Sequence, residues 1–333
     1  MAETDMDKIW AVIPVAGFGT RLRPHTHTRP KPLLHVAGQP IIGHILDQLA
    51  PLGIRRVVLV IGYMGELIVE YVQARSDFAE VAWVEQQELL GLGHAIALTR
   101  PIVGADPMLM VYGDTIFRAD LSRVLSAQGD GLLGVKKVAD PRRFGVVVEE
   151  GGQVVRLAEK PEQFVSDQAI VGVNLVRASA LLFDCLDDLI ERDIRLRGEY
   201  QLTDALQLMV ERGAHLGTFP IADWFDCGTQ EAMLDTNRHL LQDAPVPTHC
   251  TETVIVPPVH IDPTAEVRDS VIGPHVSIGA GARVQHTIVR NAIIGEQAEV
   301  EAALIENSLV GFQAVLKGRW SHLNIGDMSE ITT

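Results

Sequence analysis

The chain carries the stretch IWAVIPVAGFGTRLRPHTHTRPKPLLHVAGQPI near its N-terminus (residues 9–41). Its apolar start predicts a buried strand, which breaks into a loop that contains Gly17 and Gly19. These glycines let backbone N–H groups approach a phosphate chain closely. Arg21 and Lys31 then add two cations, ten residues apart, that can neutralise it. A strand, an amide-rich loop and two placed cations together predict a polyphosphate site.

Composition places limits on the class of protein. The chain has 333 residues, which favours about two domains, and a formal net charge of −15. That charge argues against a general nucleic-acid binder. The opening MAETDMDK does not resemble a signal peptide, and no uncharged apolar run approaches the roughly 20 residues of a membrane helix. Three widely spaced cysteines predict neither a disulfide framework nor a zinc site. We therefore expect a soluble, cytoplasmic protein with no nucleic-acid or membrane partner.

The first two thirds of the chain, from Trp10 to about Gln242, alternate short apolar runs with helix-like segments. This pattern predicts an α/β domain with a mostly parallel, Rossmann-like sheet wrapped by helices, over residues 1–242. Ligands of such sheets bind beyond the carboxyl ends of the strands, where the loop at Gly17 falls. Residues 243–250, with two closely spaced prolines, are interpreted as a linker. The predicted strands are 10–15, 57–61, 81–85, 108–112, 131–138 and 146–148, and the predicted helices include 41–52, 64–73 and 93–99.

Residues 251–333 contain an internal repeat in which an aliphatic residue recurs every five to six positions. Such a short period predicts a parallel β-helix, in which each face is a short strand with its aliphatic residue pointing inward. An ordinary sheet domain is the alternative. The recurring positions are Ile261, Val267, Ile272, Ile278, Val284, Val289, Ile294, Val300, Ile305, Val310 and Val315.

The loop AGFGTR (residues 16–21) resembles that of the sugar-1-phosphate nucleotidylyltransferases, which usually have G-G-x-G-T-R-L. Ala16-Gly17 in place of Gly-Gly resembles the bacterial UTP–glucose-1-phosphate uridylyltransferases. The resemblance continues in order over residues 8–240, and the repeat resembles the left-handed hexapeptide β-helix of long-form members. The nucleotide-binding residues that this resemblance implies are Ala16, Gly17, Gly19, Thr20, Arg21, Gln86, Gly91 and Asp114.

Two cations in this region match the family's arrangement. Arg21 follows the loop directly, where a planar guanidinium can hold the leaving pyrophosphate through paired contacts. Lys31 lies between prolines that restrict the backbone, and its offset from Arg21 is that of the family. A lone lysine would otherwise be interpreted as a solvated surface cation.

The segment EQQELLGLGHA (residues 85–95) directly follows a predicted strand. In the family a glutamine five residues before a glycine reads the nucleotide base, and Gln86 and Gly91 have this spacing. An amide can present a donor and an acceptor to the imide edge of uracil or thymine. Gln87 is a competing candidate, and a glycine-rich helix start is the simpler interpretation. The G-L-G-H-A form is closer to the uridylyltransferases than to the thymidylyltransferases.

Two aspartates are the expected ligands of Mg²⁺. Asp114 ends an apolar predicted strand, at the ligand edge of the sheet. Asp226 lies in WFDCGT (residues 224–229), which resembles the W-x-D-x-G-T string of the family. Two carboxylates, completed by phosphate oxygens and waters, are a usual way for a protein to hold Mg²⁺.

Three further motifs resemble the part of the family that binds the sugar phosphate. Gly145 lies in an F-G-V segment, where it makes room for the sugar hydroxyls. In the E-K-P motif, Glu159 would accept hydrogen bonds from those hydroxyls and Lys160 would hold the phosphate. Gly172 and Asn174 lie in a stretch that resembles the one closing over the sugar, although many glucose-specific members have tyrosine at the position of Asn174.

The resemblance implies a nucleoside triphosphate and a hexose 1-phosphate as substrates, most simply UTP or dTTP with glucose 1-phosphate. The sugar phosphate would attack the α-phosphorus in line and pyrophosphate would leave, without a protein nucleophile. The residues expected to carry catalysis are Arg21, Lys31, Lys160, Asp114 and Asp226.

Alternative functions stay open at this point. A mannose-1-phosphate guanylyltransferase is suggested by KPLLHVAGQP (residues 31–40), and a non-catalytic regulatory subunit that binds a nucleotide sugar is a second possibility. A hexapeptide acyltransferase would need a catalytic histidine, and nothing prefers His260, His275 or His286 for that role. We expect the repeat domain to be structural and to hold a homo-oligomer together.

Overall fold

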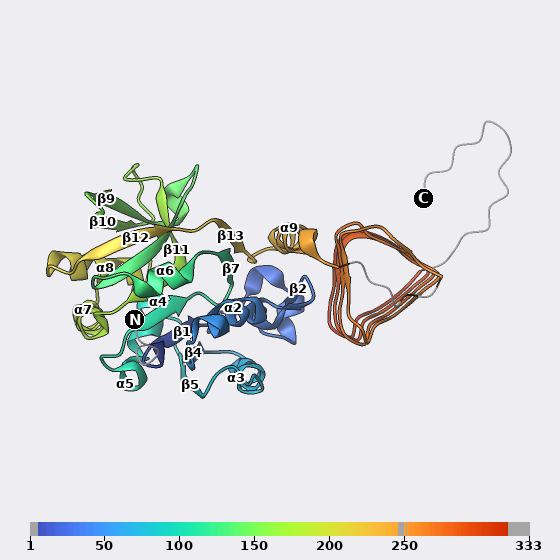
Figure 1. The fold of residues 1–333 in the computed structure, drawn as a ribbon, viewed down its shortest axis with the longest axis horizontal. Coiled ribbons are helices and arrows are strands. Elements are labelled where there is room, and N and C mark those ends of the chain that lie inside the picture. Colours follow the sequence, from blue (N-terminus) through green and yellow to red (C-terminus); the bar gives the residue numbers. More distant parts are fainter. Residues whose placement is uncertain (1–5, 246–249, 251, 319–333) are drawn as a thin grey trace. The chain divides into compact units, whose positions relative to one another are not determined.

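A computed structural model describes residues 6–245, 250 and 252–318 (Figure 1). By backbone contacts the chain divides into a first unit, residues 6–34 and 40–232, and a second unit, residues 35–39 and 233–318. Most of helix α9 (Gln230–Leu240) therefore groups with the repeat region. Part of the predicted linker, residues 246–249, lies outside the described residues. The boundary at Gln242 stays a prediction.

The centre of the first unit is a parallel sheet. Strands β1 (Trp10–Pro14), β4 (Arg56–Ile61), β5 (Glu80–Glu85) and β6 (Met108–Val111) pair in the order β6-β1-β4-β5, and each pair is parallel. The central strands β1, β4 and β6 are almost wholly buried, as expected for a sheet with both faces covered. The predicted parallel sheet is confirmed here.

The remaining strands make the sheet mixed. Strand β11 (Gln168–Val176) runs antiparallel to β6, and β8 (Gly131–Lys137) and β9 (Gly145–Glu150) are antiparallel to β11. A tight turn at Gly151 and Gly152, both with positive φ, joins β9 to β10 (Gln153–Glu159) as an antiparallel hairpin. Strand β12 (Leu216–Pro220) is parallel to β8. The sequence analysis did not predict β10, β11 or β12.

Helices cover both faces of this sheet (Figure 1). One core includes apolar side chains of α2 (Ile41–Leu49), α3 (Gly65–Gln73) and α6 (Leu121–Ser126). The other includes those of α4 (Leu92–Ala97), α5 (Arg100–Val103), α7 (Ser179–Glu191) and α8 (Leu202–Glu211). The predicted helices are confirmed, with α2 ending in a 3₁₀ turn at Ala50–Leu52.

The second unit is a stack of short parallel strands with a triangular outline (Figure 1). Along one series, Val254 pairs with Val271, Val271 with Ile288 and Ile288 with Leu304, so each coil takes 17 or 16 residues. Three faces of five to six residues account for these coils, consistent with the predicted left-handed β-helix. The strands are β14 (Val254–Ile255), β15 (Val259–Ile261), β16 (Glu266–Arg268), β17 (Val271–Ile272), β18 (Val276–Ile278), β19 (Arg283–Gln285), β20 (Ile288–Ile294), β21 (Glu299–Glu301), β22 (Leu304–Val310) and β23 (Val315–Lys317).

Most of the predicted inward positions of the repeat form one buried core. The exception is Val315, which is 61% exposed in the last described coil. The short strands β2 (His35–Val36) and β3 (Gln39–Pro40) also contribute to this unit. Here the backbone N–H of Ala37 donates to Oδ1 of the fully buried Asn237, at 3.0 Å.

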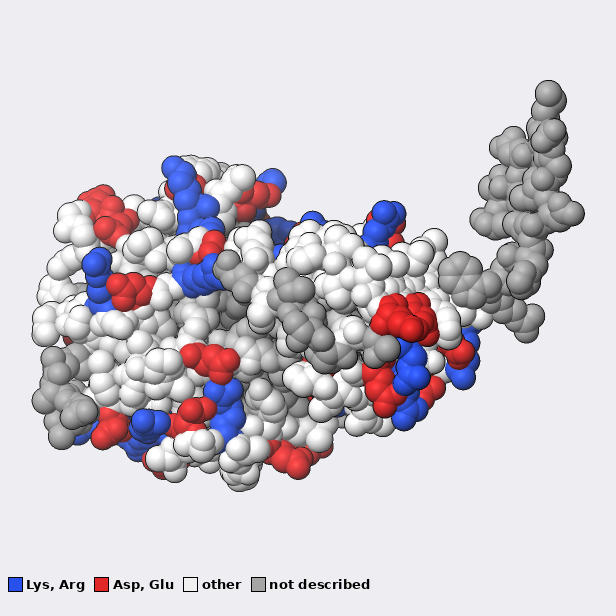
Figure 2. Space-filling model, turned by 45° about the vertical axis from the view of Figure 1, so that its right-hand side comes forward, with Lys and Arg blue, Asp and Glu red and all other residues white. Residues whose placement is uncertain are grey.

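Acidic and basic side chains intermingle among the described residues on the face drawn in Figure 2, without a broad basic area. In the described part of the chain, no helix has the length and apolarity needed to span a membrane.

Candidate active site

The loop after β1 contains two glycines, and each has a different structural role. Gly19 has a φ of 60°, and a Cβ there would come within 3.0 Å of side-chain atoms of Lys31 and Thr26. Its positive φ and crowded surroundings therefore require glycine. At Gly17 an added Cβ would meet nothing within 4 Å, so the backbone borders open space. The loop is thus fixed at Gly19 and open to a ligand at Gly17.

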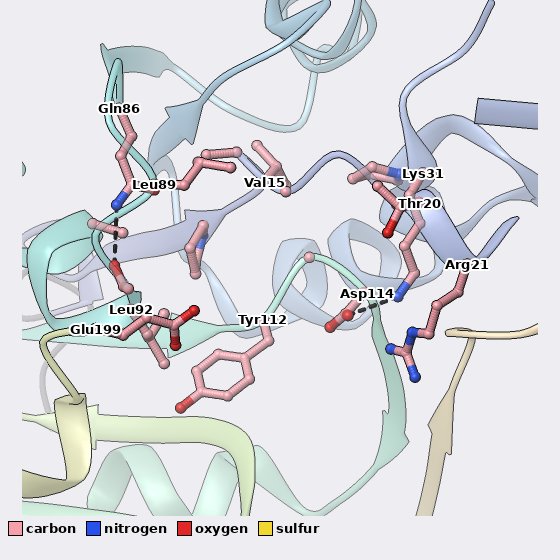
Figure 3. A pocket seen from close by; sticks show the side chains of 18 residues that line it. Val15, Thr20, Arg21, Lys31, Gln86, Leu89, Leu92, Tyr112, Asp114 and Glu199 are labelled. Atoms are coloured by element: carbon pink, nitrogen blue, oxygen red, sulfur yellow. Dashed lines mark hydrogen bonds and ion pairs between the residues drawn. The ribbon is translucent and has the colours of Figure 1, made fainter. Parts of the chain in front are cut away.

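This loop forms one wall of a cavity of about 600 Å³ (Figure 3). The cavity brings together every residue that the sequence analysis assigned to nucleotide binding, although their positions run from Ala16 to Asp114. Figure 3 shows Gln86 at one side of the cavity and the cationic groups of Lys31 and Arg21 at the other. A base and a phosphate chain could therefore occupy opposite ends.

Lys31 is held at the centre of a charged cluster. It begins the 3₁₀ turn Lys31–Leu33, between Pro30 and Pro32, and is only 8% exposed. Its Nζ lies 2.7 Å from Oδ2 of Asp114 and 3.9 Å from Oδ1 of Asp226. The two predicted metal ligands thus converge on one ammonium group.

Strand pairing explains why the two aspartates meet. Strand β13 (Asp223–Asp226) runs antiparallel to β7 (Thr115–Arg118), with Asp226 directly opposite Thr115. Asp114 precedes Thr115, so both carboxylates reach the same edge. A Cβ at Gly228 would lie 2.7 Å from Nη2 of Arg21 and 2.8 Å from Oδ1 of Asp226. Glycine at this position leaves room for the guanidinium beside the carboxylate.

A second cavity, of about 310 Å³, contains most of the residues predicted to bind the sugar phosphate. Glu159 ends β10 directly opposite Gly145, and its Oε2 accepts a 2.6 Å hydrogen bond from Oγ1 of Thr203. Its Oε1 lies 3.3 Å from Nζ of Lys160. A Cβ at Gly145 would lie 2.6 Å from Oγ1 of Thr203, so only glycine leaves this network intact. The second cavity therefore has an acceptor and a cation beside each other.

Asn174 is not brought to either cavity. It lies inside β11, opposite Met110 on one neighbouring strand and Leu133 on the other, and is fully buried. Neither polar atom of its amide has a hydrogen-bond partner among the described residues. Asn174 is therefore buried in the interior of the sheet and lines neither cavity. Gly172, by contrast, lines the second cavity, and a Cβ there would clash with the ring of Tyr112.

The two cavities share part of their walls. Arg21 and Asp114 line both of them, and Asp226 lines the second. Leu92, Tyr112 and Glu199 complete the shared set. The charged cluster therefore lies where the contents of one cavity would meet those of the other.

Sequence reasoning missed several residues that line the cavities. Tyr112 directly precedes the predicted Gly113-Asp114 motif, and burial, together with Glu159 and Asp114, raises the pKa of its hydroxyl, which stays protonated. Glu199 and Thr203 come from the segment EYQLT (residues 199–203), which follows Gly198 and runs into the first residues of α8. A glycine followed by polar residues at a helix start was the only local signal for this segment.

Comparisons with known proteins agree with this arrangement. A family model described as "Nucleotidyl transferase" matches residues 10–243, and one described as "GlmU-like, C-terminal hexapeptide" matches residues 246–318. A glucose-1-phosphate thymidylyltransferase of Streptomyces griseus is 34% identical over 292 residues, which cover 84% of this chain and 80% of that protein.

Two further relatives extend the comparison. A bifunctional protein GlmU of Methanocaldococcus jannaschii is 35% identical over 234 residues, which cover 69% of this chain but 54% of that protein. The chain thus matches about half the length of that relative. A crystal structure assigned as a glucose-1-phosphate thymidylyltransferase from Bacillus anthracis, in complex with a sucrose, superposes with a TM-score of 0.60 at 26% identity. It covers 72% of this chain and 98% of the other.

Proposed function

This chain belongs to the nucleotidyl transferase family, and from that premise we propose that it joins a nucleoside triphosphate to a hexose 1-phosphate. The products are a nucleoside-diphosphate hexose and pyrophosphate. The observation that carries the proposal is the pair of cavities that share Arg21 and Asp114. One cavity has the glycine loop and the other has the Glu159–Lys160 pair, so the charged cluster lies at their junction.

The reaction needs no protein nucleophile. A phosphate oxygen of the hexose 1-phosphate forms a bond to the α-phosphorus of the triphosphate, and the bond from that phosphorus to the bridging oxygen of pyrophosphate breaks. Arg21 and Lys31, which both line the first cavity, would neutralise the triphosphate and the departing pyrophosphate. Lys160 would hold the phosphate of the sugar, and Glu159 would accept hydrogen bonds from its hydroxyls. Catalysis is then positioning and charge neutralisation.

The charges of the cluster support the requirement for a divalent cation. Lys31 and Arg21 carry two positive charges, which the carboxylates of Asp114 and Asp226 balance. The protein groups alone therefore offer a polyphosphate little net attraction. Asp114 and Asp226 are hard oxygen donors that would hold Mg²⁺, which supplies two further positive charges to neutralise the phosphates when bound.

We propose UTP or dTTP with glucose 1-phosphate as the substrates. Two Streptomyces relatives, 34% and 30% identical, are named glucose-1-phosphate thymidylyltransferase. Gln86, at the end of the first cavity away from the cations, suits an imide base edge. A homo-oligomer held by the β-helix and a cytoplasmic location stay predictions.

The test is pyrophosphate release from each of four or five nucleoside triphosphates with several hexose 1-phosphates, in the presence of Mg²⁺. We expect release to need both substrates and to be fastest with UTP or dTTP and glucose 1-phosphate. Omission of the sugar phosphate is the control. No release with any pair would contradict the proposed function, whereas a tenfold preference for GTP with mannose 1-phosphate would replace the proposed substrates.

A further inference from the structure

The side chain of Gln86 is buried, with 6% exposure, and its amide is held in one orientation. Its Nε2 lies 3.0 Å from the backbone oxygen of Gly91, a contact drawn in Figure 3, and 3.1 Å from Nδ1 of His94. A carbonyl oxygen can only accept, so the amide atom that faces Gly91 must be the NH₂ group. Rotation of the amide by half a turn would instead place two oxygens against each other. Gly91 therefore fixes which end of the amide faces the helix.

The same geometry sets the protonation of His94. Because the NH₂ group of Gln86 donates, Nδ1 of His94 must accept, and the ring proton lies on Nε2. Burial lowers the pKa of His94 below its usual value, so the ring is neutral at pH 7. The charges of Glu88 and Arg195 act on the ring in opposite directions, and the ring of Tyr200 lies 6.5 Å away.

Both N–H groups of Gln86 are thus used inside the protein. Gln86 lines the first cavity, whereas His94 is not among the residues that line it. The side chain of Gln86 can then offer the contents of the cavity only its oxygen, Oε1. His94 would therefore influence a bound base only through its contact with Gln86, which makes it a positioning residue.

We propose that His94 is a specificity-determining residue, which locks Gln86 as a hydrogen-bond acceptor and so selects bases that carry a proton on the central ring nitrogen. This inference rests on the proposed function. Uracil and thymine have such a proton at N3 and guanine has one at N1. Cytosine N3 and adenine N1 are acceptors, which would face the oxygen of Gln86 and leave two buried acceptors unpaired.

UTP and CTP give the sharpest comparison, because their bases have nearly the same size and differ along this edge. The matched variants are His94→Asn and His94→Leu, whose side chains have the same number and branching of heavy atoms. The Asn amide oxygen can take the place of Nδ1 as an acceptor, whereas Leu leaves one N–H of Gln86 unpaired and free to turn toward the base. His94→Ala also removes the Nδ1 acceptor. It serves as a second variant in case the larger leucine disturbs the packing of α4, since alanine favours the helix.

The measurement is kcat/KM for UTP and for CTP with one hexose 1-phosphate and Mg²⁺. We expect the native protein to prefer UTP, and His94→Leu and His94→Ala to lower the UTP-to-CTP ratio about tenfold through KM, as expected for a hydrogen bond of this kind. His94→Asn should keep the ratio within about threefold of the native value.

An unchanged ratio in both His94→Leu and His94→Ala would overturn the inference, as would a native protein that uses CTP as well as UTP. Equal losses with both nucleotides would show a merely structural role and would also overturn it. A native protein that releases no pyrophosphate with any nucleotide would instead contradict the proposed function.

Discussion

The ammonium nitrogen of Lys31 lies 2.7 Å from Oδ2 of Asp114, in the wall of the first cavity. The lysine side chain is largely buried and that of the aspartate is about half exposed, so the carboxylate keeps an open side toward both cavities. A largely buried cation is thus held by a carboxylate that is itself about half exposed. The ion pair between Lys31 and Asp114 therefore sets the local charge where we expect the reaction to occur.

The first prediction concerns the two carboxylates. Asp114→Asn or Asp226→Asn removes one charge from the proposed Mg²⁺ site, and we expect turnover to fall at least about 100-fold. The rate of pyrophosphate release measures the effect, and thermal unfolding checks that the fold is intact. Asp223→Asn, on the same strand but in an exposed ion pair with Arg118, is the matched control. Full activity in either variant, or with excess chelator, would refute the metal assignment.

A second prediction separates the roles of two cations. Arg21→Ala should lower kcat more than it raises KM, because charge on the departing pyrophosphate grows in the transition state. Lys160→Ala should chiefly raise KM for the hexose 1-phosphate, since it lines only the second cavity. Steady-state kinetics with each substrate varied in turn measures both effects, with Arg23→Ala as the surface control. If both variants affect only the triphosphate, this division of roles is wrong.

The hydroxyl of Thr203 provides a third prediction. It donates the 2.6 Å hydrogen bond that orients Glu159. Thr203→Val keeps the shape and removes the donor, so we expect KM for the hexose 1-phosphate to rise about fivefold, corresponding to about 1 kcal/mol. Thr203→Ser, which keeps the hydroxyl, should stay near the native value. Equal KM values for the Val and Ser variants would show that this bond does not position Glu159.

The pH dependence of nucleotide binding is the fourth prediction. Protonation of His94 would make Nδ1 a donor that opposes the N–H of Gln86. Burial lowers the pKa of His94 below 6.5, so KM for UTP should be level above pH 6.5 and rise as the pH falls below the lowered value. His94→Asn has no such proton and should show a smaller rise. A native KM that rises no more than that of His94→Asn as the pH falls below 6.5 would contradict this expectation.

The lowered pKa of His94 also predicts how the free energy of unfolding depends on pH. Because the pKa of His94 is lower in the folded state, the unfolded chain binds the proton first. The contribution of this group to the free energy of unfolding is complete above pH 6.5 and decreases as the pH falls toward the lowered pKa.

The fifth prediction concerns assembly through the β-helix. Leu304 is 82% exposed and lies in register with the exposed Ile288, so the outer face presents a row of aliphatic side chains. If this row holds the expected homo-oligomer, Leu304→Glu should give a smaller assembly in light scattering, because a charge would then be buried in the interface. Lys317→Glu, also exposed, is the control. An unchanged assembly size would place the interface elsewhere.

Local pattern in the sequence was enough for much of the fold. The glycine loop, the parallel strands near the N-terminus and the helices after them follow from short-range periodicity and turn residues. The coils of the repeat follow from the spacing of residues such as Ile272, Ile278 and Val284, which all lie in the core. The residues that the resemblance assigned to nucleotide binding also converge, because the parallel strands β1, β5 and β6 deliver their ends to one edge of the sheet.

Tertiary structure alone decided the pairings between distant segments. The register that sets Asp226 opposite Thr115, the burial of Asn174 within β11 and the donation from Thr203 to Glu159 each join segments far apart in the chain. Periodicity shows which face of a strand is apolar but not which neighbours cover it, and a shift of one residue would exchange the faces. For that reason the sequence could nominate Gln86 as the base reader, whereas only the folded contacts with Gly91 and His94 decide that it presents an acceptor.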